Sequence, residues 1–290
     1  MAFSAGTGAP LKHSSATDKG LCRGNNEDSF LSSPEHGLWL VADGMGGHEA
    51  GEVASAIVKD TVARSVGSGQ ALGEAIQQSH HEVLEAANNG RGAAGMGSTV
   101  VALHSDALNY EVAWVGDSRA YLWTLEADGG RLEQLTTDHS YVQMLLATGA
   151  IAEDEVDNHP DKNVITQCIG SIDLPQVNVD SVFGKWEERQ WLLLCSDGLT
   201  DEVDDQTIAR TLCDAKSSRD AVQRLVQVAL SRGGRDNVTV QIVESPFSKP
   251  LPLAALWDWL PAITGKRLWD GALYGAACLS LLLMLYWLVA

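Results

Sequence analysis

Short apolar runs bounded by Gly, Asp or Asn recur through the first 244 residues and restrict the fold classes that the chain can adopt. Runs of this kind are typical of β-strands, and they occupy residues 38–42, 98–103, 108–115, 119–125, 177–183, 190–195 and 237–243. Helical periodicity is found at residues 50–66, 70–88, 141–148, 205–215 and 218–232. A parallel doubly wound sheet would place a helix after nearly every strand, whereas these strands and helices are grouped. The sequence therefore predicts an α+β fold with largely antiparallel sheets.

The charge balance excludes one large class of partner. The chain has 20 Lys and Arg against 38 Asp and Glu, a formal net charge of -18, and so acidic a surface repels a phosphate backbone. We therefore expect no nucleic-acid binding. The 5 cysteines are scattered and form no Cys-x-x-Cys pair, which indicates neither a zinc site nor a disulfide scaffold and fits a reducing cytosol.

The stretch at residues 271–290 contains no charged side chain and as a helix is long enough to cross a bilayer. Lys266 and Arg267 precede it, and Trp and Tyr residues lie near both of its ends, as in membrane-spanning segments. We predict a folded domain over residues 1–245, a Pro- and Trp-containing linker over 246–267 and a transmembrane helix over 268–290. The alternative for the last segment is a buried C-terminal helix of the globular domain.

Four aspartates stand where an apolar strand meets a glycine-flanked turn: Asp43, Asp117, Asp197 and Asp236. Glycine lets the backbone turn tightly and come close to a bound ion. If these strand ends converge, the carboxylates share a small volume and cannot all stay ionised without a cation. Oxygen ligands select Mg²⁺ or Mn²⁺ over zinc or copper. Any single Asp could instead form a turn or cap a helix, but four equivalent junctions favour a metal centre.

A further acidic element, Glu27 and Asp28, follows Arg23 in the sequence Arg-Gly-Asn-Asn-Glu-Asp. A guanidinium presents a planar fork that suits two phosphate oxygens. A surface salt bridge from Arg23 to Glu27 is the alternative. The neighbouring candidate metal ligands favour the phosphate-binding interpretation.

These residues belong to a pattern that resembles the metal-dependent Ser/Thr protein phosphatases of type 2C, also called the PPM family, and more closely its compact bacterial members. The resemblance covers about residues 10 to 244, and its eight motifs occur in the family's order. They are the segments 17–28, 43–47, 97–99, 115–119, 138–140, 149–151, 196–199 and 234–237.

The resemblance implies two packed antiparallel β-sheets, a β-sandwich flanked by helix pairs, with a dinuclear Mn²⁺ or Mg²⁺ centre at one end. It implies that Asp43 bridges the two ions, that Asp197 and Asp236 complete one of them and that the Gly44 carbonyl completes the other. The remaining positions carry supporting roles in the family. By position, Glu27 and Asp28 would hold metal-bound waters, Asp117 with Asp197 would form a weaker third site, and Arg23 would grip the substrate phosphate.

Two features near the cleft bear on the mechanism implied by the resemblance. Residues from His139 to about Ile169 match the family's mobile flap. Animal members often carry a His two residues after the bridging Asp as a candidate general acid, and here that position is Met45. His48 lies three residues further on, where a helix-start or surface role is the more common one.

Two other functional classes were weighed against a metal-dependent phosphatase. A cysteine phosphatase needs an Arg about six residues after its Cys, and Asp201 stands there after Cys195, which is better explained as a buried strand residue. A catalytically dead phosphoprotein-binding relative should have lost a metal carboxylate, and none is lost here.

The resemblance also suggests partners and a location. We expect phosphorylated proteins as substrates, with a bacterial Ser/Thr kinase and its substrates as partners. With the predicted tail, the chain would be anchored in the bacterial inner membrane, its catalytic domain in the cytoplasm because Lys266 and Arg267 precede the span. The oligomeric state and the choice between Mn²⁺ and Mg²⁺ remain open at this point.

Overall fold

The computed structural model describes residues 10–47, 50–106, 108–126, 129–156 and 159–247. Contacts divide the chain into two units, residues 1–248 and residues 249–290, and the described residues all lie in the first. The predicted transmembrane helix, most of the predicted linker and His48 fall outside the described residues. None of the helices in these ranges combines the length and the apolar character that a membrane span requires.

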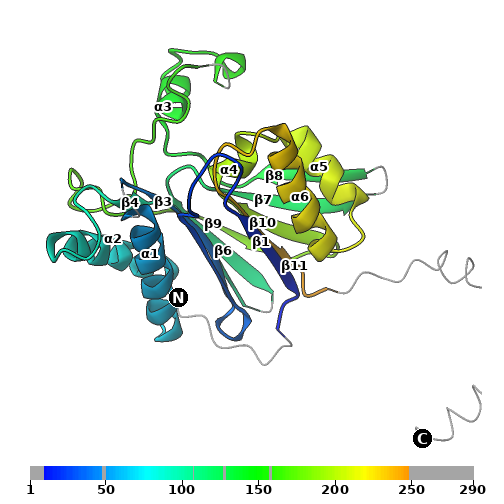
Figure 1. The fold of residues 1–290 in the computed structure, drawn as a ribbon. Helices are drawn as coiled ribbons and strands as arrows, with labels where there is room; N and C mark the ends of the chain where they lie inside the picture. The colour runs from blue at the N-terminus through cyan, green and yellow to red at the C-terminus, as the bar shows by residue number, and fades with distance from the viewer. Residues whose placement is uncertain (1–9, 48–49, 107, 127–128, 157–158, 248–290) are drawn as a thin grey trace, which may run out of the picture. The chain divides into compact units, whose positions relative to one another are not determined.

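Two β-sheets form the centre of this unit (Figure 1). The first has the order β1-β11-β10-β7-β8, with β1 at His13–Asp18, β7 at Arg119–Glu126, β8 at Gly129–Gln134, β10 at Gln190–Cys195 and β11 at Val238–Glu244. The second has the order β2-β3-β5-β6-β9, with β2 at Asp28–Ser33, β3 at Leu38–Met45, β5 at Val100–Ser105, β6 at Asn109–Val115 and β9 at Asp180–Lys185, while β4 at Gly97–Ser98 pairs with β3. Every pairing is antiparallel, which confirms the predicted α+β class.

Helices cover the outer face of each sheet. The second sheet packs against α1 (Ala50–Gly67) and α2 (Leu72–Asn88), and the first packs against α4 (Asp197–Thr200), α5 (Asp205–Asp214) and α6 (Ser218–Arg232). The short helix α3 (Tyr141–Ala147) lies apart from these layers (Figure 1).

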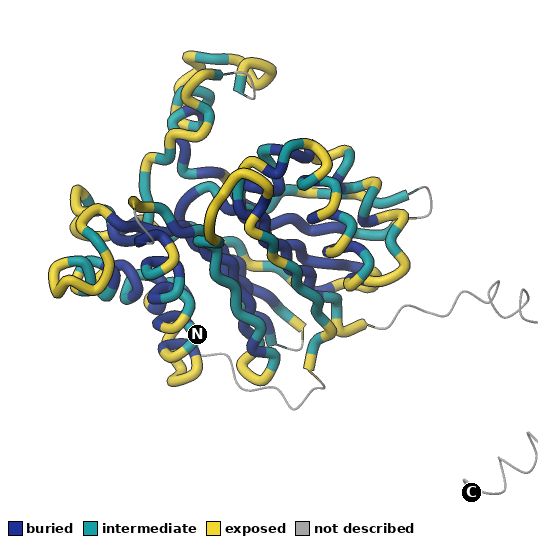
Figure 2. The backbone as a smooth tube through the Cα atoms, viewed as in Figure 1, coloured by how far each residue is buried: buried dark blue, intermediate teal, exposed yellow. Residues whose placement is uncertain are grey.

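Strand β3 shows why its sequence is apolar without alternation. Leu38 and Leu40 face the helices α1 and α2, whereas Trp39 and Val41 face the opposite sheet. Both faces are therefore buried, as the dark strands at the centre of Figure 2 show. The β-sandwich predicted from the resemblance is the observed arrangement.

Several element boundaries differ from those predicted. The strands β1 and β2 were missed because their sequences, His-Ser-Ser-Ala-Thr-Asp and Asp-Ser-Phe-Leu-Ser-Ser, are mostly polar, and each forms by pairing with the apolar strand beside it. The predicted strand at 98–103 is divided into β4 and β5 at Thr99, whose amide donates to the Asp43 carbonyl at 2.8 Å. The predicted strand at 177–183 begins later, at Asp180.

Candidate active site

The aspartates singled out in the sequence meet at one end of the two sheets. Asp43 lies near the end of β3, opposite Asp28 of β2 in the strand register, and Asp117 follows β6. From the other sheet, Asp197 begins α4 directly after β10, and Asp236 precedes β11. Asp43 interacts electrostatically with Asp28, Asp117 and Asp197. Asp236 interacts in the same way with Asp28 and Asp197, so the five carboxyls form one cluster.

The carboxyls of the cluster are half-buried, and this loss of hydration is the largest cause of the raised pKa of four of them, Asp28, Asp43, Asp117 and Asp197. Burial, followed by the charges of neighbouring carboxylates, raises the pKa of Asp117 to about 8 and places that of Asp43 well above its usual range. The same effect of burial raises the pKa of Asp28 to about 7, although Ser196 donates a hydrogen bond to its Oδ2 at 2.8 Å. It also raises the pKa of Asp197 to about 6. Without a compensating cation, Asp117 is therefore mostly protonated at neutral pH and Asp28 about half protonated, whereas Asp197 is mostly ionised.

Two oxygens in the cluster fit a divalent ion. Oδ1 of Asp28 and Oδ1 of Asp197 are buried and have no hydrogen-bond partner among the described residues. No group of three or more Asp, Glu, His or Cys side chains in the described ranges is arranged so that it could hold a metal ion as it stands. Both Asp43 and Asp197 would have to be ionised for an ion to lie between them. Hard ions also take backbone carbonyls and waters as ligands, so side chains need not complete the shell.

The backbone beside Asp43 is packed too closely for any side chain at Gly44. A Cβ there would collide with the Gly51 carbonyl oxygen at the start of α1 and would lie 2.6 Å from the Glu27 carbonyl oxygen. The Gly44 amide also donates to that Glu27 oxygen at 3.2 Å. Gly44 thus joins β3, α1 and the loop before β2, which brings Glu27 beside the cluster.

Arg23 extends over the cluster from the loop between β1 and β2. Its Nη2 donates to Oδ2 of Asp236 at 2.5 Å, and half of the side chain, 51%, is exposed. The salt bridge to Glu27 considered from the sequence is therefore not the observed one, and the partner lies 213 positions away. From the sequence we expected Arg23 near the candidate metal ligands, and in the structure it contacts one of them, Asp236.

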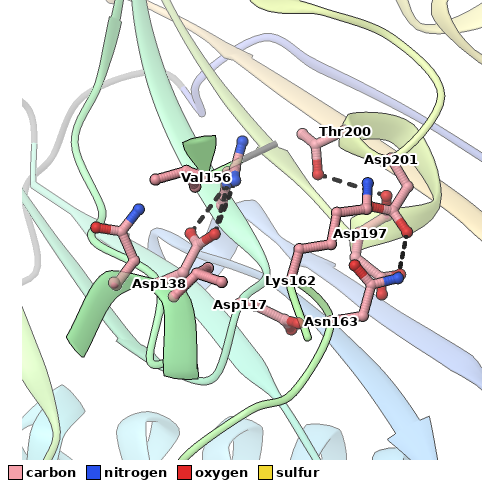
Figure 3. Close-up of a pocket in the computed structure, with 11 residues that line it drawn as sticks. Asp117, Asp138, Val156, Lys162, Asn163, Asp197, Thr200 and Asp201 are labelled. Atoms are coloured by element: carbon pink, nitrogen blue, oxygen red, sulfur yellow. Dashed lines mark hydrogen bonds and ion pairs between the residues drawn. The ribbon is translucent and has the colours of Figure 1, made fainter. Parts of the chain in front are cut away.

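A cavity of about 70 Å³ lies between this cluster and the segment containing α3. Asp117 and Asp197 line one side, and Lys162 and Asn163 approach Asp201 from the other (Figure 3). Lys162 Nζ lies 3.2 Å from Oδ1 of Asp201, and Asn163 Nδ2 donates to Oδ2 at 2.9 Å.

The contacts between the residues that line this cavity were not predicted from the sequence. Asp201 lies four residues after Asp197, a spacing that places both on one side of a helical turn and was the one signal of their proximity. Arg119 and Asp138 also line this cavity. The Arg119 guanidinium donates two hydrogen bonds from Nε and one from Nη2 to the carboxylate of Asp138. A contact between these two could not be inferred from their separate motifs.

The base of the predicted flap is fixed to the sheets by His139. Its Nδ1 accepts from the Gly116 amide at 3.1 Å and from Nε2 of Gln167 at 2.8 Å, so Nε2 carries the proton that faces Asp180 at 3.2 Å. Within the flap, residues 157 and 158 lie outside the described ranges. Met45 is the last residue of β3, which continues three residues beyond the predicted end of that strand at Ala42.

Cys195 has the properties expected of a strand residue and not of a nucleophile. Its side chain is fully buried, and burial raises the pKa of its thiol to about 12. A thiolate is the nucleophilic form of cysteine. This geometry gives no support to a cysteine phosphatase.

Comparisons with known proteins agree with this geometry. Residues 6–143 match the family model described as protein phosphatase 2C. The serine/threonine phosphatase stp of Listeria monocytogenes is 36% identical over 246 residues, which are 80% of this chain and 95% of that protein. The chain belongs to the protein phosphatase 2C family. It is a metal-dependent serine/threonine protein phosphatase of the bacterial type, which confirms the resemblance found in the eight motifs.

Solved structures of this family share the fold. The crystal structure of Stp1 from Staphylococcus aureus superposes with a TM-score of 0.75 at 32% identity, and covers 84% of this chain and 98% of that one. The catalytic domain of the phosphatase PstP, determined in complex with two manganese ions, superposes with a TM-score of 0.70 at 31% identity, and covers 81% of this chain and 98% of that one.

Proposed function

We propose that the acidic cluster holds two Mn²⁺ or Mg²⁺ ions with which the protein removes phosphate from phosphoserine and phosphothreonine side chains of other proteins. The observation that carries this proposal is the convergence of the half-buried carboxyls of Asp28, Asp43 and Asp197, two of whose oxygens are buried without a hydrogen-bond partner among the described residues. The two manganese ions of the PstP structure support the same metal and number.

We assign the ligands by combining position in the family motifs with the observed geometry. Asp43 interacts with Asp28, Asp117 and Asp197 and would contact both ions, Asp197 and Asp236 would complete one of them, and the Gly44 carbonyl would complete the other. Glu27 and Asp28 would orient water around the ions. Asp117, whose carboxyl lines the cavity with Asp197, would add a weaker third site.

The ions, the carboxylates and Arg23 have different roles in the reaction. When bound, the ions supply positive charge that lowers the pKa of water and stabilises the phosphoryl oxygens during in-line attack. Asp43 and Asp197 must be ionised to bind the ions, since metal ligands are deprotonated. The half-exposed Arg23 would donate hydrogen bonds to the incoming phosphate. Its present partner, Asp236, would then be free to act as a metal ligand.

The partners and location follow from the sequence outside the described residues. We propose that residues 1–245 form the phosphatase domain, that 246–267 form a linker and that 268–290 anchor the chain in the bacterial inner membrane with the domain in the cytoplasm. Anchoring would raise the effective concentration of the domain near membrane kinases. A bacterial Ser/Thr kinase and its substrates are the partners that this placement favours.

The test of this function is dephosphorylation of matched peptides that differ in their phosphorylated residue. We expect the protein with Mn²⁺ to release phosphate from phosphoserine and phosphothreonine peptides, and to lose this activity with excess chelator. A thiol alkylating reagent, applied to a Cys22→Ser variant because Cys22 is exposed beside Arg23, serves as the control and should have no effect, because Cys195 is buried. Full activity after exhaustive chelation, or inactivation by the alkylating reagent with metal present, would contradict the proposal.

A further inference from the structure

The side chain of Asn237 uses all of its hydrogen-bonding atoms on one loop far away in the sequence. This residue lies between Asp236 and β11 and is 4% exposed. Its Oδ1 accepts from the Glu27 amide at 2.7 Å, and its Nδ2 donates to the carbonyls of Lys19 and Asn25, each at 2.9 Å. All three partners are backbone groups of residues 19–27, the loop between β1 and β2 that carries Arg23, which we call the Arg23 loop.

This loop has little regular structure to hold it. Residues 19–27 belong to neither strand, so their amides and carbonyls must find partners outside a sheet. One backbone bond, from the Leu21 amide to the Gly234 carbonyl at 2.7 Å, fixes it to the same turn that contains Asn237. The bonds of Asn237 to Lys19 and Asn25 lie on either side of Arg23 and thereby fix both ends of the segment that presents the guanidinium.

We propose that Asn237 is a positioning residue that holds Arg23 in place for the substrate phosphate. The inference rests on the proposed function, because it requires Arg23 to bind that phosphate. Asn237 acts through the loop and need not touch the substrate. An amide is suited to the task because it offers an acceptor to one backbone group and donors to two others at the same time.

The change Asn237→Asp isolates this role. Aspartate keeps an oxygen for the Glu27 amide but replaces the donor with an oxygen that faces two carbonyl oxygens. Glu27 has independent support, because its carbonyl accepts from Ser55 Oγ at 2.6 Å and from the Gly44 amide at 3.2 Å. The loss therefore falls on Lys19 and Asn25, and so on the segment that carries Arg23.

The experiment is a double-mutant cycle in KM and kcat with a phosphothreonine peptide, using the full-length chain in mild detergent at saturating Mn²⁺. We expect Asn237→Asp to raise KM about tenfold while kcat changes less than about threefold, because a substrate-binding interaction is weakened. In the Arg23→Ala background the same change should raise KM less than about twofold, since the interaction that it disturbs is already absent.

Gln241→Glu is the matched control. Gln241 is also a buried amide, it lies on β11, and its Nε2 donates to the Leu31 carbonyl and to Ser32 Oγ, both at 2.9 Å, in strand β2. The same exchange of nitrogen for oxygen should lower the thermal stability and leave KM unchanged. If Asn237→Asp fails to fold, Asn237→Ser, which buries no charge, takes its place in the cycle.

The outcomes separate the inference from the function on which it rests. An equal rise in KM with and without Arg23 would overturn the positioning role, as would a loss of thermal stability with KM unchanged, as expected for Gln241→Glu. An Arg23→Ala variant with wild-type KM would contradict the phosphate-binding role of Arg23, and the inference with it. Metal-dependent activity that is absent altogether would contradict the proposed function.

Discussion

At the scale of single residues, five carboxyls from separate motifs share one half-buried site, and their combined negative charge is the feature that most needs a compensating cation. Burial and mutual repulsion raise the pKa of Asp28, Asp43, Asp117 and Asp197 together. The candidate residues could be found from the sequence because Asp beside Gly at a strand end is a local pattern. The pairing of Arg23 with Asp236 could not, because it depends on how two distant turns pack.

Asp236→Asn should lower kcat by at least about 10³, or roughly 4 kcal/mol, because a neutral ligand weakens the metal site that activates water. The measurement is kcat with a phosphothreonine peptide at saturating Mn²⁺. Retention of more than about a tenth of the wild-type kcat would show that Asp236 is not a metal ligand.

Arg23→Ala should act mainly on KM. Removing a charged hydrogen-bond donor to phosphate costs about 1.5–3 kcal/mol of binding, or roughly tenfold to a hundredfold in KM. A smaller loss in kcat is expected where the same contact stabilises the transition state. A variant with reduced kcat and unchanged KM would place Arg23 in a different role.

At the scale of elements, the apolar strands could be predicted and the polar ones could not. β3 and β10 are buried on both faces and read as continuous apolar runs. β1 and β2 carry polar sequences and become strands only because β11 and β3 supply partners, which is a tertiary effect that no local pattern contains. The start of α4 at Asp197 was missed because four residues are too few for helical periodicity.

The junction of β3 with α1 depends on Gly44. Gly44→Ala should lower the free energy of unfolding by about 2 kcal/mol, because the added methyl collides with backbone that cannot rotate away. Gly73→Ala in α2 is the matched control, since a Cβ there meets nothing within 4 Å, and it should be neutral or slightly stabilising. Urea unfolding of both variants checks this, and equal stability of the two would refute the packing argument.

At the scale of the whole molecule, the acidic site links folding to pH and to metal. The folded pKa values of Asp28, Asp117 and Asp197, about 7, about 8 and about 6, lie above the ordinary value of 3.8, so the folded metal-free protein binds protons more tightly than the unfolded chain. The resulting stability is fully present below about pH 4 and is lost as the pH rises through the range from about 6 to 8.

Bound metal should oppose this loss of stability at higher pH. Thermal unfolding in the presence of chelator should therefore show a lower Tm at about pH 8 than at about pH 5.5, whereas the rise in Tm caused by Mn²⁺ should be larger at the higher pH, because ligands bind as carboxylates. A gain from Mn²⁺ that is independent of pH would argue against binding at these groups.

The predicted transmembrane helix at residues 268–290 leads to a prediction about membrane association of the whole chain. We expect the full-length protein to remain in bacterial membranes after a carbonate wash and the same chain ending at residue 248 to be released. In spheroplasts the catalytic domain should resist external protease, because Lys266 and Arg267 favour a cytoplasmic N-terminal side. Release of the full-length chain would contradict the anchor, and digestion from outside would contradict its orientation.

The central claim is that the acidic cluster binds the catalytic ions, and the most direct test is calorimetric titration of Mn²⁺ into the wild type and into Asp43→Asn. The account predicts two ions bound per wild-type chain and loss of both in the variant, because Asp43 is the ligand proposed to contact both ions and interacts with three of the other carboxyls. Two ions bound by Asp43→Asn with unchanged affinity, or none bound by a wild-type protein that still hydrolyses phosphopeptides, would contradict it.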